Sequence, residues 1–352
     1  MSQKSNGLIG FACSYAPLQV IHAAGFTPYR ILPEGDTPDQ AGQLLHDNLC
    51  PHVKRILDRG MSNDVPKLKG IVFVNSCDPM RRLADAWKDT RPNENVMVID
   101  LPSVKNDSSV SFYSKEISRF SKTLSQWGNE KRVSDEKLVH SMELYNMLAD
   151  LLKQLRKKVR RNELEGGRAT LQKIYNYVGQ NQVEDCIKLV KQHLEKKIVS
   201  TKTDGVPLFL FGNVLPDVKT FELFEECGAF IADDDLCTGS RMITQVLEPD
   251  KKDLYLSISR SLFSSPPCAR TFEESRPFQI AENVLERARK AGAKGVIGYT
   301  LKFCDLYLSR LPFIREILKN EGLPVLVIEG DCSLGSLGQQ QTRIEAFIEM
   351  MR

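Results

Sequence analysis

The sequence contains no apolar run approaching the ~20 residues that a membrane-spanning helix needs. Its first residues, MSQKSNGLIGFACSY, also lack the apolar stretch and small-residue cleavage site of a secretory signal. We therefore expect a cytoplasmic protein. Low-complexity segments are absent as well. With 352 residues, 41% of them hydrophobic and 26% charged, the chain has the composition of a soluble globular protein with two or three domains.

An excess of one charge sign is also missing. The net charge of +3 is too small to indicate nucleic-acid binding, and aromatic residues do not interleave with basic ones. No GxxxxGK[ST] phosphate loop occurs, so ATP chemistry is not expected in this chain. Nine cysteines are present without any CxxC pair, which argues against a zinc ribbon or a ferredoxin cluster. A cytoplasmic chain should hold no structural disulfides, so any metal site must combine distant cysteines.

Apolar strands alternate with helical segments at both ends of the chain, and this alternation predicts parallel pairing in doubly wound α/β sheets. The middle shows only helical periodicity, including a helix over Asp135–Arg161 with Ser134 as its N-cap. We expect an N-terminal α/β domain over 1–112, a helical domain over 113–203 and a C-terminal α/β domain over 204–352. The expected strands are Leu8–Ala12, Thr27–Leu32, Gly70–Asn75, Val96–Leu101, Pro207–Phe211, Ala229–Ala232, Gly295–Leu301 and Val325–Glu329.

The stretch from Gly295 to Asp331 is the clearest strand–helix–strand unit. Its first strand is followed directly by Cys304, and a helix over Leu311–Asn320 leads to the next strand. In an open α/β sheet, ligands bind beyond the carboxyl ends of the strands. Cys304 is predicted to lie there, although a free cysteine can also be a small core residue.

Three further cysteines, Cys77, Cys237 and Cys332, also follow predicted strands, and Cys50 opens a predicted helix. Two doubly wound domains that face one another would turn their strand ends toward a shared crevice. Thiolates near helix N-termini have a lowered pKa and suit a soft metal such as iron in a cluster.

Other features leave their roles open. Cys186 lies within a predicted helix and Cys227 ends one, so we expect both to be structural, whereas Cys268 is undecided. The acidic run that opens Asp233–Arg241 either caps the following segment or has a chemical role that the sequence does not assign. The helix over Asp135–Arg161 ends in a basic run, expected to be a solvated face or, alternatively, an anion-binding surface; the run is Lys153, Arg156, Lys157, Lys158, Arg160 and Arg161.

Seven segments together resemble the 2-hydroxyacyl-CoA dehydratase and benzoyl-CoA reductase family. They cover nearly the whole chain in the family's order, and only the helical middle matches loosely. The segments are CSYAPLQVIHAAGFTPYRILPEG, LCPHVKRILDRG, VNSCDPMRRLADAW, DDDLCTGSR, KFCDLY, PVLVIEGD and TRIEAFIEM.

The resemblance implies two flavodoxin-like domains with a helical domain between them. It also implies an oxygen-sensitive [4Fe-4S] cluster held by three separated cysteines, which by motif are Cys50, Cys77 and Cys304. Leu306 stands where many members have proline, and this departure leaves the ligand in place. The N-terminal loop with Ser14, and Glu34 after the second strand, match the region where substrate-binding subunits place polar groups. Ser14 is expected to hold a ligand of the open iron and Glu34 to move a proton; the alternatives are a helix N-cap and a solvated turn.

The activity that the resemblance implies is a lyase reaction. A related subunit or a second copy of the chain, an acyl-CoA substrate and a separate ATP-dependent activator are the implied partners. One electron from the activator forms a ketyl radical from a 2-hydroxyacyl-CoA, and water is eliminated. The alternatives are a benzoyl-CoA reductase-like enzyme, a double-cubane-cluster reductase in which Cys13 or Cys237 joins the trio, and a non-catalytic electron-relay subunit.

Overall fold

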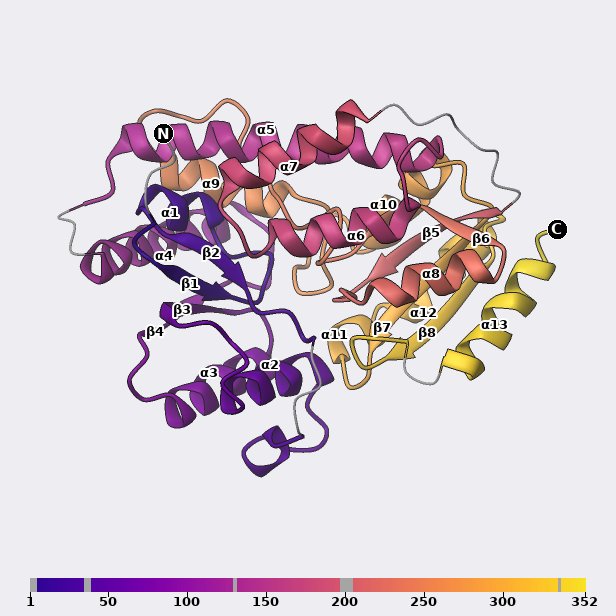
Figure 1. The fold of residues 1–352 in the computed structure, drawn as a ribbon, viewed down its shortest axis with the longest axis horizontal. Coiled ribbons are helices and arrows are strands. Elements are labelled where there is room, and N and C mark those ends of the chain that lie inside the picture. The colour runs from indigo at the N-terminus through magenta and orange to yellow at the C-terminus, as the bar shows by residue number, and fades with distance from the viewer. Residues whose placement is uncertain (1–4, 35–38, 129–131, 197–204, 335–336) are drawn as a thin grey trace.

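The computed structural model describes residues 5–34, 39–128, 132–196, 205–334 and 337–352. In these residues the strands form two parallel sheets of four, ordered β2-β1-β3-β4 and β6-β5-β7-β8 (Figure 1). The predicted α/β fold with two parallel sheets is therefore confirmed. No helix in the described part of the chain combines the length and apolar composition needed to cross a bilayer.

The N-terminal sheet is built from β1 (Leu8–Phe11), β2 (Thr27–Arg30), β3 (Leu68–Asn75) and β4 (Val96–Asp100). Its central strand β3 is almost entirely buried, as expected for a strand covered by helices on both faces. One face carries α2 (Pro51–Met61) and α3 (Asp78–Thr90), and the short 3₁₀ turn η1 (Ala41–Gln43) precedes α2. The other face carries α1 (Leu18–Ala23) and α4 (Asp107–Trp127).

Helices α5 (Asp135–Arg160), α6 (Gly167–Val178) and α7 (Val183–Glu195) connect the two sheets. The predicted N-cap of α5 is confirmed, because the Lys137 amide donates to the Ser134 hydroxyl at 3.3 Å. In Figure 1, α5 runs along the top of the molecule above both sheets. The predicted boundary near residue 112 falls inside α4, and the one near residue 203 lies outside the described residues. The three-domain division stays a prediction.

The C-terminal sheet contains β5 (Val206–Gly212), β6 (Ala229–Asp235), β7 (Gly295–Leu301) and β8 (Val325–Gly330). Around it lie α8 (Val218–Glu226), α10 (Gln279–Lys290), α11 (Asp305–Leu308), α12 (Leu311–Asn320) and α13 (Leu337–Glu349). All seven residues of β7 are buried, which explains its uninterrupted apolar sequence. The predicted bounds of β7 and α12 are confirmed.

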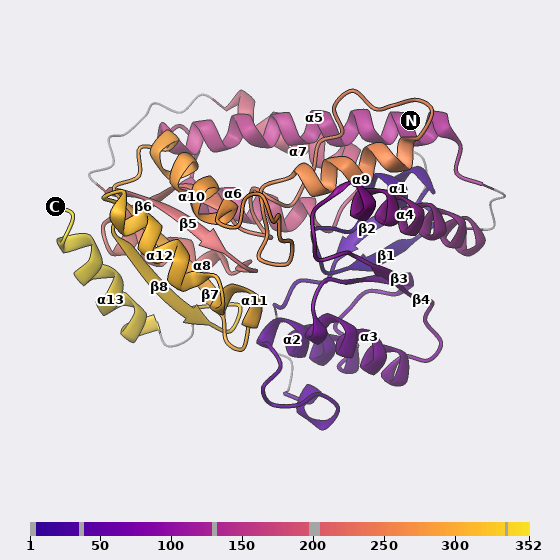
Figure 2. The same cartoon turned by 180° about the vertical axis from the view of Figure 1, so that it is seen from behind.

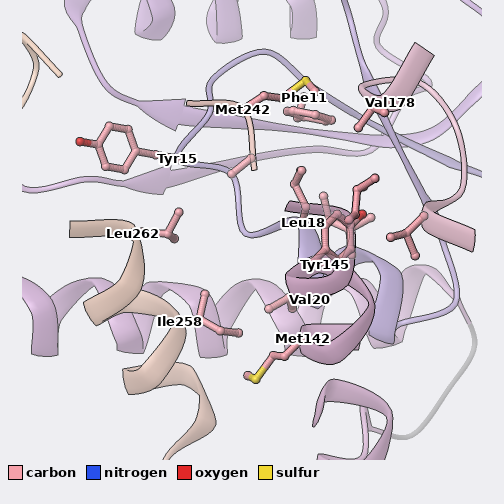
Figure 3. Close-up of a cluster of buried hydrophobic side chains, with 14 of the residues drawn as sticks. Phe11, Tyr15, Leu18, Val20, Met142, Tyr145, Val178, Met242, Ile258 and Leu262 are labelled. Carbon is pink, nitrogen blue, oxygen red and sulfur yellow. The ribbon is translucent and has the colours of Figure 1, made fainter. Parts of the chain in front are cut away.

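The largest core cluster joins parts of the chain that are far apart in sequence. Helix α9 (Leu254–Ser264) follows the strands β5 and β6, yet it packs against α4 on the N-terminal side of the molecule (Figure 2). Its Ile258 and Leu262 share this cluster with Phe11 of β1 and Met142 of α5 (Figure 3). The chain therefore crosses between its two halves more than once, and each crossing fixes their relative position.

Candidate functional site

The carboxyl ends of both sheets meet between the two halves of the molecule. Ser14, in the loop after β1, donates its hydroxyl to the Cys237 carbonyl after β6 at 3.0 Å. Arg30, the last residue of β2, donates Nη1 to the same carbonyl at 2.6 Å. Arg270 reaches the Asn75 carbonyl at the end of β3 at 3.3 Å and also bonds the Leu101 carbonyl after β4. The two strand ends thus enclose one shared crevice, which is where parallel sheets bind ligands.

Cys50, Cys77 and Cys304, the three predicted cluster ligands, occupy equivalent positions in the structure. Each is the N-cap residue of a helix, namely α2, α3 and α11. Backbone N–H groups of the following turn, those of Val53, Met80 and Tyr307 respectively, lower the pKa of each thiol, although none of the three sulfurs accepts a cap hydrogen bond. A helix N-terminus favours a negatively charged group, so the fold presents each sulfur to unpaired N–H donors.

Burial opposes the charge on these three sulfurs. Desolvation raises the pKa of Cys50 to about 11 and that of Cys77 to about 12, and it also raises the pKa of Cys304. The Asn213 side-chain amide donates to the Cys304 sulfur at 3.0 Å and partly offsets this effect. Without a bound cation the three groups are therefore neutral thiols at pH 7.

A charge on one of the three sulfurs would change the pKa of the others. Charge on Cys50 or Cys304 would raise the pKa of Cys77, and charge on Cys304 would raise that of Cys50. Among the described residues, however, no three His, Cys, Asp or Glu side chains are gathered closely enough to hold a metal ion.

Two buried side chains, Arg30 and His52, each have nitrogen atoms without a hydrogen-bond partner among the described residues. Arg30 is 1% exposed, and its Nε and Nη2 find no acceptor among the described residues. His52, two residues after Cys50, is 6% exposed, and its Nδ1 likewise has no partner there. Burial first, and the Arg30 charge second, lower the pKa of His52 to about 3, so its imidazole is neutral. Unpaired buried polar atoms are costly, and such a group indicates a missing partner.

The two predicted polar residues, Ser14 and Glu34, have different surroundings. Ser14 is not the N-cap of α1, because that position belongs to Pro17. Its hydroxyl hydrogen is committed to the Cys237 carbonyl, which leaves only acceptor capacity. Glu34 is exposed at the mouth of the crevice and accepts a hydrogen bond from Asn176 of α6 at 2.9 Å. The structure does not bring Ser14 and Glu34 into contact with each other.

The structure also brings together a second group of thiols, which the sequence did not predict as a group. Cys237 accepts a hydrogen bond from Arg241 Nη2 at 3.3 Å. The neighbouring Cys268 thiol, together with the positive charges of Arg241 and Arg30, lowers the pKa of Cys237 to about 5, while the pKa of Cys268 is raised well above its ordinary value. Cys13 lies close enough for its charge to interact with Cys237. By contrast, Cys186 and Cys227 are core residues.

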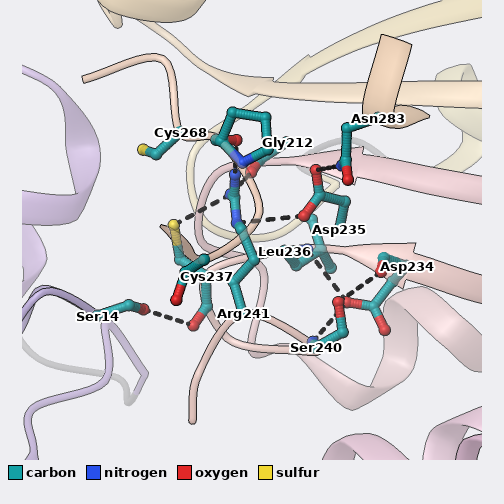
Figure 4. Close-up of polar contacts among 12 residues, drawn as sticks. Ser14, Gly212, Asp234, Asp235, Leu236, Cys237, Ser240, Arg241, Cys268 and Asn283 are labelled. Carbon is teal, nitrogen blue, oxygen red and sulfur yellow. Dashed lines mark hydrogen bonds and ion pairs between the residues drawn. The ribbon is translucent and has the colours of Figure 1, made fainter. Parts of the chain in front are cut away.

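The acidic run turns out to be the end of β6, which extends three residues beyond its predicted end at Ala232. Asp234 bonds the amides of Leu236 and Ser240, and Asp235 bonds Asn283 (Figure 4). Five arginines from four parts of the chain lie 2.9–3.8 Å from the three buried carboxylates; they are Arg156 and Arg160 of α5, Arg168, Arg241 and Arg287. Part of the basic run on α5 is therefore an internal ion-pair surface, not a solvated face.

Comparison with known proteins shows the family to which the chain belongs. A family model described as "2-hydroxyglutaryl-CoA dehydratase, D-component" matches residues 13–351. Lactoyl-CoA dehydratase subunit beta of Anaerotignum propionicum is 23% identical, covering 99% of this chain and 93% of its own. One of the benzoyl-CoA reductase subunits of Thauera aromatica is 22% identical over 92% of this chain and 85% of its own. (R)-2-hydroxyglutaryl-CoA dehydratase, subunit beta, of Acidaminococcus fermentans is 21% identical, with coverages of 97% and 92%.

The chain belongs to the 2-hydroxyglutaryl-CoA dehydratase D-component family. The predicted family resemblance is confirmed. The relatives include subunits of both dehydratases and a reductase, so membership fixes the family and leaves the reaction of this chain to be tested.

Proposed function

We propose that this chain is the iron–sulfur subunit of a 2-hydroxyacyl-CoA dehydratase, which eliminates water from a 2-hydroxyacyl-CoA thioester through a ketyl radical. Support comes from the family match over residues 13–351. The observation that carries the proposal is the common placement of Cys50, Cys77 and Cys304. All three cap helices, and Cys77 and Cys304 follow strands of the two different sheets.

The residues present fit a cluster better than a single ion. Thiolates are soft ligands that select iron–sulfur clusters, and no three His, Cys, Asp or Glu side chains of the described residues are close enough to hold a single ion. A [4Fe-4S] cluster held there would supply one-electron transfer to the substrate after reduction by a separate ATP-dependent activator. Since the trio consists of neutral thiols at pH 7, loading must release protons, and the N-terminal amides of three helices favour the resulting thiolates.

Neighbouring side chains would bind and orient the substrate. The unpaired Nε and Nη2 of Arg30 supply two hydrogen-bond donors inside the crevice for an anionic or carbonyl oxygen. Ser14 offers acceptor capacity beside Cys13, in the loop after β1. Glu34 is the proposed proton carrier: desolvation raises its pKa, and Arg59 opposes that effect. A carboxylate with a raised pKa exchanges protons more readily near neutral pH.

We further propose that the two α/β domains are flavodoxin-like and that the chain works with a related subunit. The orders β2-β1-β3-β4 and β6-β5-β7-β8 support the first point, since flavodoxin-like sheets also place the second strand outside the first. Relatives named as beta subunits support the second. Size-exclusion chromatography of the chain expressed alone tests the pairing: a catalytically competent homodimer would rule out an obligate heterodimer.

The cluster assignment is tested by comparing Cys304→Ser with Cys186→Ser, both purified without oxygen. We expect Cys304→Ser to lose most of its iron and the broad visible absorption of a cluster, because one of three ligands is gone. Cys186 is fully buried between helices of the connecting region and should be dispensable for iron binding. Full iron content and an unchanged spectrum in Cys304→Ser would show that the ligands are elsewhere.

A reductase of the benzoyl-CoA or double-cubane type is the second candidate, favoured by the likeness to the benzoyl-CoA reductase of Thauera aromatica. About four irons per chain fits a [4Fe-4S] protein, whereas about eight would indicate the larger cluster. With an activator and a 2-hydroxyacyl-CoA, formation of the unsaturated thioester supports the dehydratase. A chain that carries iron but binds no acyl-CoA would instead be an electron-relay subunit.

A further inference from the structure

Cys237 and Cys268 form a thiol pair that the proposed cluster does not use. Cys237 lies two residues after β6, and Cys268 lies in the segment between α9 and α10. Both side chains line one small cavity, and each thiol shifts the pKa of the other, although the residues are far apart in sequence. In Figure 4 both side chains extend toward the same side of Arg241.

Arg241 holds this pair in place. Its Nη2 donates to the Cys237 sulfur at 3.3 Å and to the Gly212 carbonyl, and its Nη1 donates to the Pro267 carbonyl beside Cys268 at 3.2 Å. The guanidinium is 6% exposed and is also fixed by the Tyr307 hydroxyl at 3.0 Å. One rigid cation therefore contacts the first sulfur and the backbone next to the second.

A small cavity opens onto both sulfurs. Its walls include Cys13, Tyr15, Cys237, Leu262 and Cys268, and its volume is about 40 Å³. Since about 10–15 Å³ of such volume is enough to hold one water molecule, there is room for a few waters or a molecule of peroxide size. A bulky disulfide reagent such as glutathione disulfide does not fit.

The chemical states of the two thiols are complementary. The neighbouring Cys268 thiol and the charge of Arg241 stabilise a thiolate at Cys237, whereas Cys268 keeps its proton. A thiolate is the attacking species in thiol chemistry, and a neighbouring protonated thiol can resolve the first product.

We propose that Cys237 and Cys268 are a redox-active dithiol that reacts with small peroxides and closes to a disulfide. The Cys237 thiolate attacks one oxygen of hydrogen peroxide, the O–O bond breaks, and the hydroxide released takes up a proton to form water. Cys237 becomes a sulfenic acid, oxidised by two electrons. The Cys268 sulfur then displaces the sulfenic oxygen as a second water, using the Cys268 proton, and the S–S bond forms. An external dithiol returns both residues to thiols.

This inference does not depend on the cluster or on the dehydratase reaction. The test uses the full chain purified without oxygen, treated with one equivalent of hydrogen peroxide and then mapped by mass spectrometry without reduction. We expect a link between Cys237 and Cys268 that dithiothreitol removes. Cys227 shares a tryptic peptide with Cys237, so the experiment is run in a Cys227→Ser background.

Two variants separate the steps. Cys268→Ser should stop at the sulfenic acid and give a dimedone adduct on Cys237, and Cys237→Ser should give neither product. Because the hydrogen bond and the charge of Arg241 favour the thiolate at Cys237, we expect peroxide to consume Cys237 faster than Cys186, whose pKa is raised by burial. Cys186→Ser is the matched control and should behave as the parent.

Three results would overturn the proposal. These are the absence of the link in a chain whose other thiols are oxidised, an unchanged peroxide rate in Cys237→Ser, and a loss of iron in Cys237→Ser as large as in Cys304→Ser. The last result would make Cys237 a cluster ligand. Circular dichroism of each variant confirms that the fold is retained.

Discussion

Breaking the ion pair between Arg168 and Asp234 should loosen the connecting helices from the C-terminal sheet. Arg168 of α6 lies 2.9 Å from Asp234 of β6, and the two side chains are 2% and 0% exposed. Burial raises the pKa of Asp234, but Arg168 and hydrogen bonds to the carboxylate outweigh burial and lower it overall. Arg168→Met keeps an apolar side chain at this position but removes the charge and the guanidinium that stacks on Tyr175 and Phe221.

The expected cost follows from the environment of the pair. Removing one partner of a buried ion pair costs about 3–5 kcal/mol, because the remaining charge is left without compensation. Asp234→Asn should cost a similar amount, since it leaves Arg168 buried and unpaired. The double variant Arg168→Met/Asp234→Asn should cost less than the sum of the two by about 1–3 kcal/mol, because no buried charge is left over.

Urea unfolding followed by circular dichroism measures these changes as shifts of the midpoint. Arg289→Met is the matched control: Arg289 lies 2.7 Å from Glu321, but the side chains are 55% and 47% exposed. An exposed pair of this kind contributes about 0–1 kcal/mol. If Arg168→Met shifts the midpoint no more than Arg289→Met, the buried pair does not hold α6 on β6, and the reasoning is wrong.

Two further predictions concern pH and backbone geometry. Burial lowers the pKa of His22 despite the nearby Glu184, so below about pH 6.5 the unfolded chain binds the proton more readily and stability decreases as the pH is lowered. In His22→Gln the urea midpoint should therefore depend less on pH between pH 7 and 5. An unchanged pH dependence would exclude His22 as its source. Gly212 has a φ of +149°, and a Cβ there would lie 1.8 Å from the Tyr299 carbonyl oxygen. Gly212→Ala should therefore cost more than about 2 kcal/mol in thermal unfolding, whereas Gly42→Ala, with open space around its Cβ, should change stability by less than about 1 kcal/mol.

The sequence predicted the parallel strands well because burial on both faces leaves an unmistakable apolar run, as in Gly295–Leu301. It failed where tertiary contacts decide. The strand β6 was predicted to end at Ala232, since aspartates normally mark loops, but arginines of distant helices compensate its buried carboxylates. Helix α9 was not predicted, because its serines interrupt the apolar pattern that signals a helix; Asp253 caps it and Ile258 lies on its buried face.

For the site, the sequence placed cysteines at strand ends, and the structure adds that Cys50, Cys77 and Cys304 are all N-caps. Their role as cluster ligands stays a prediction. The proximity of Cys237 and Cys268 could not be predicted, because nothing local relates residues on separate segments. The only sequence signal was Arg241 four residues after Cys237.

The position of α9 has a consequence for how the protein is made. The strands of the N-terminal sheet are complete once Asp100 leaves the ribosome, but one face of that half of the molecule packs against α9, which ends at Ser264. At ~5–20 residues per second, the gap between these points takes roughly 10–30 s of synthesis. During that interval apolar side chains such as Tyr113 and Phe120 lack part of their final cover. Nascent chains that stop before residue 264 should therefore bind chaperones or aggregate, although they contain every strand of the first sheet.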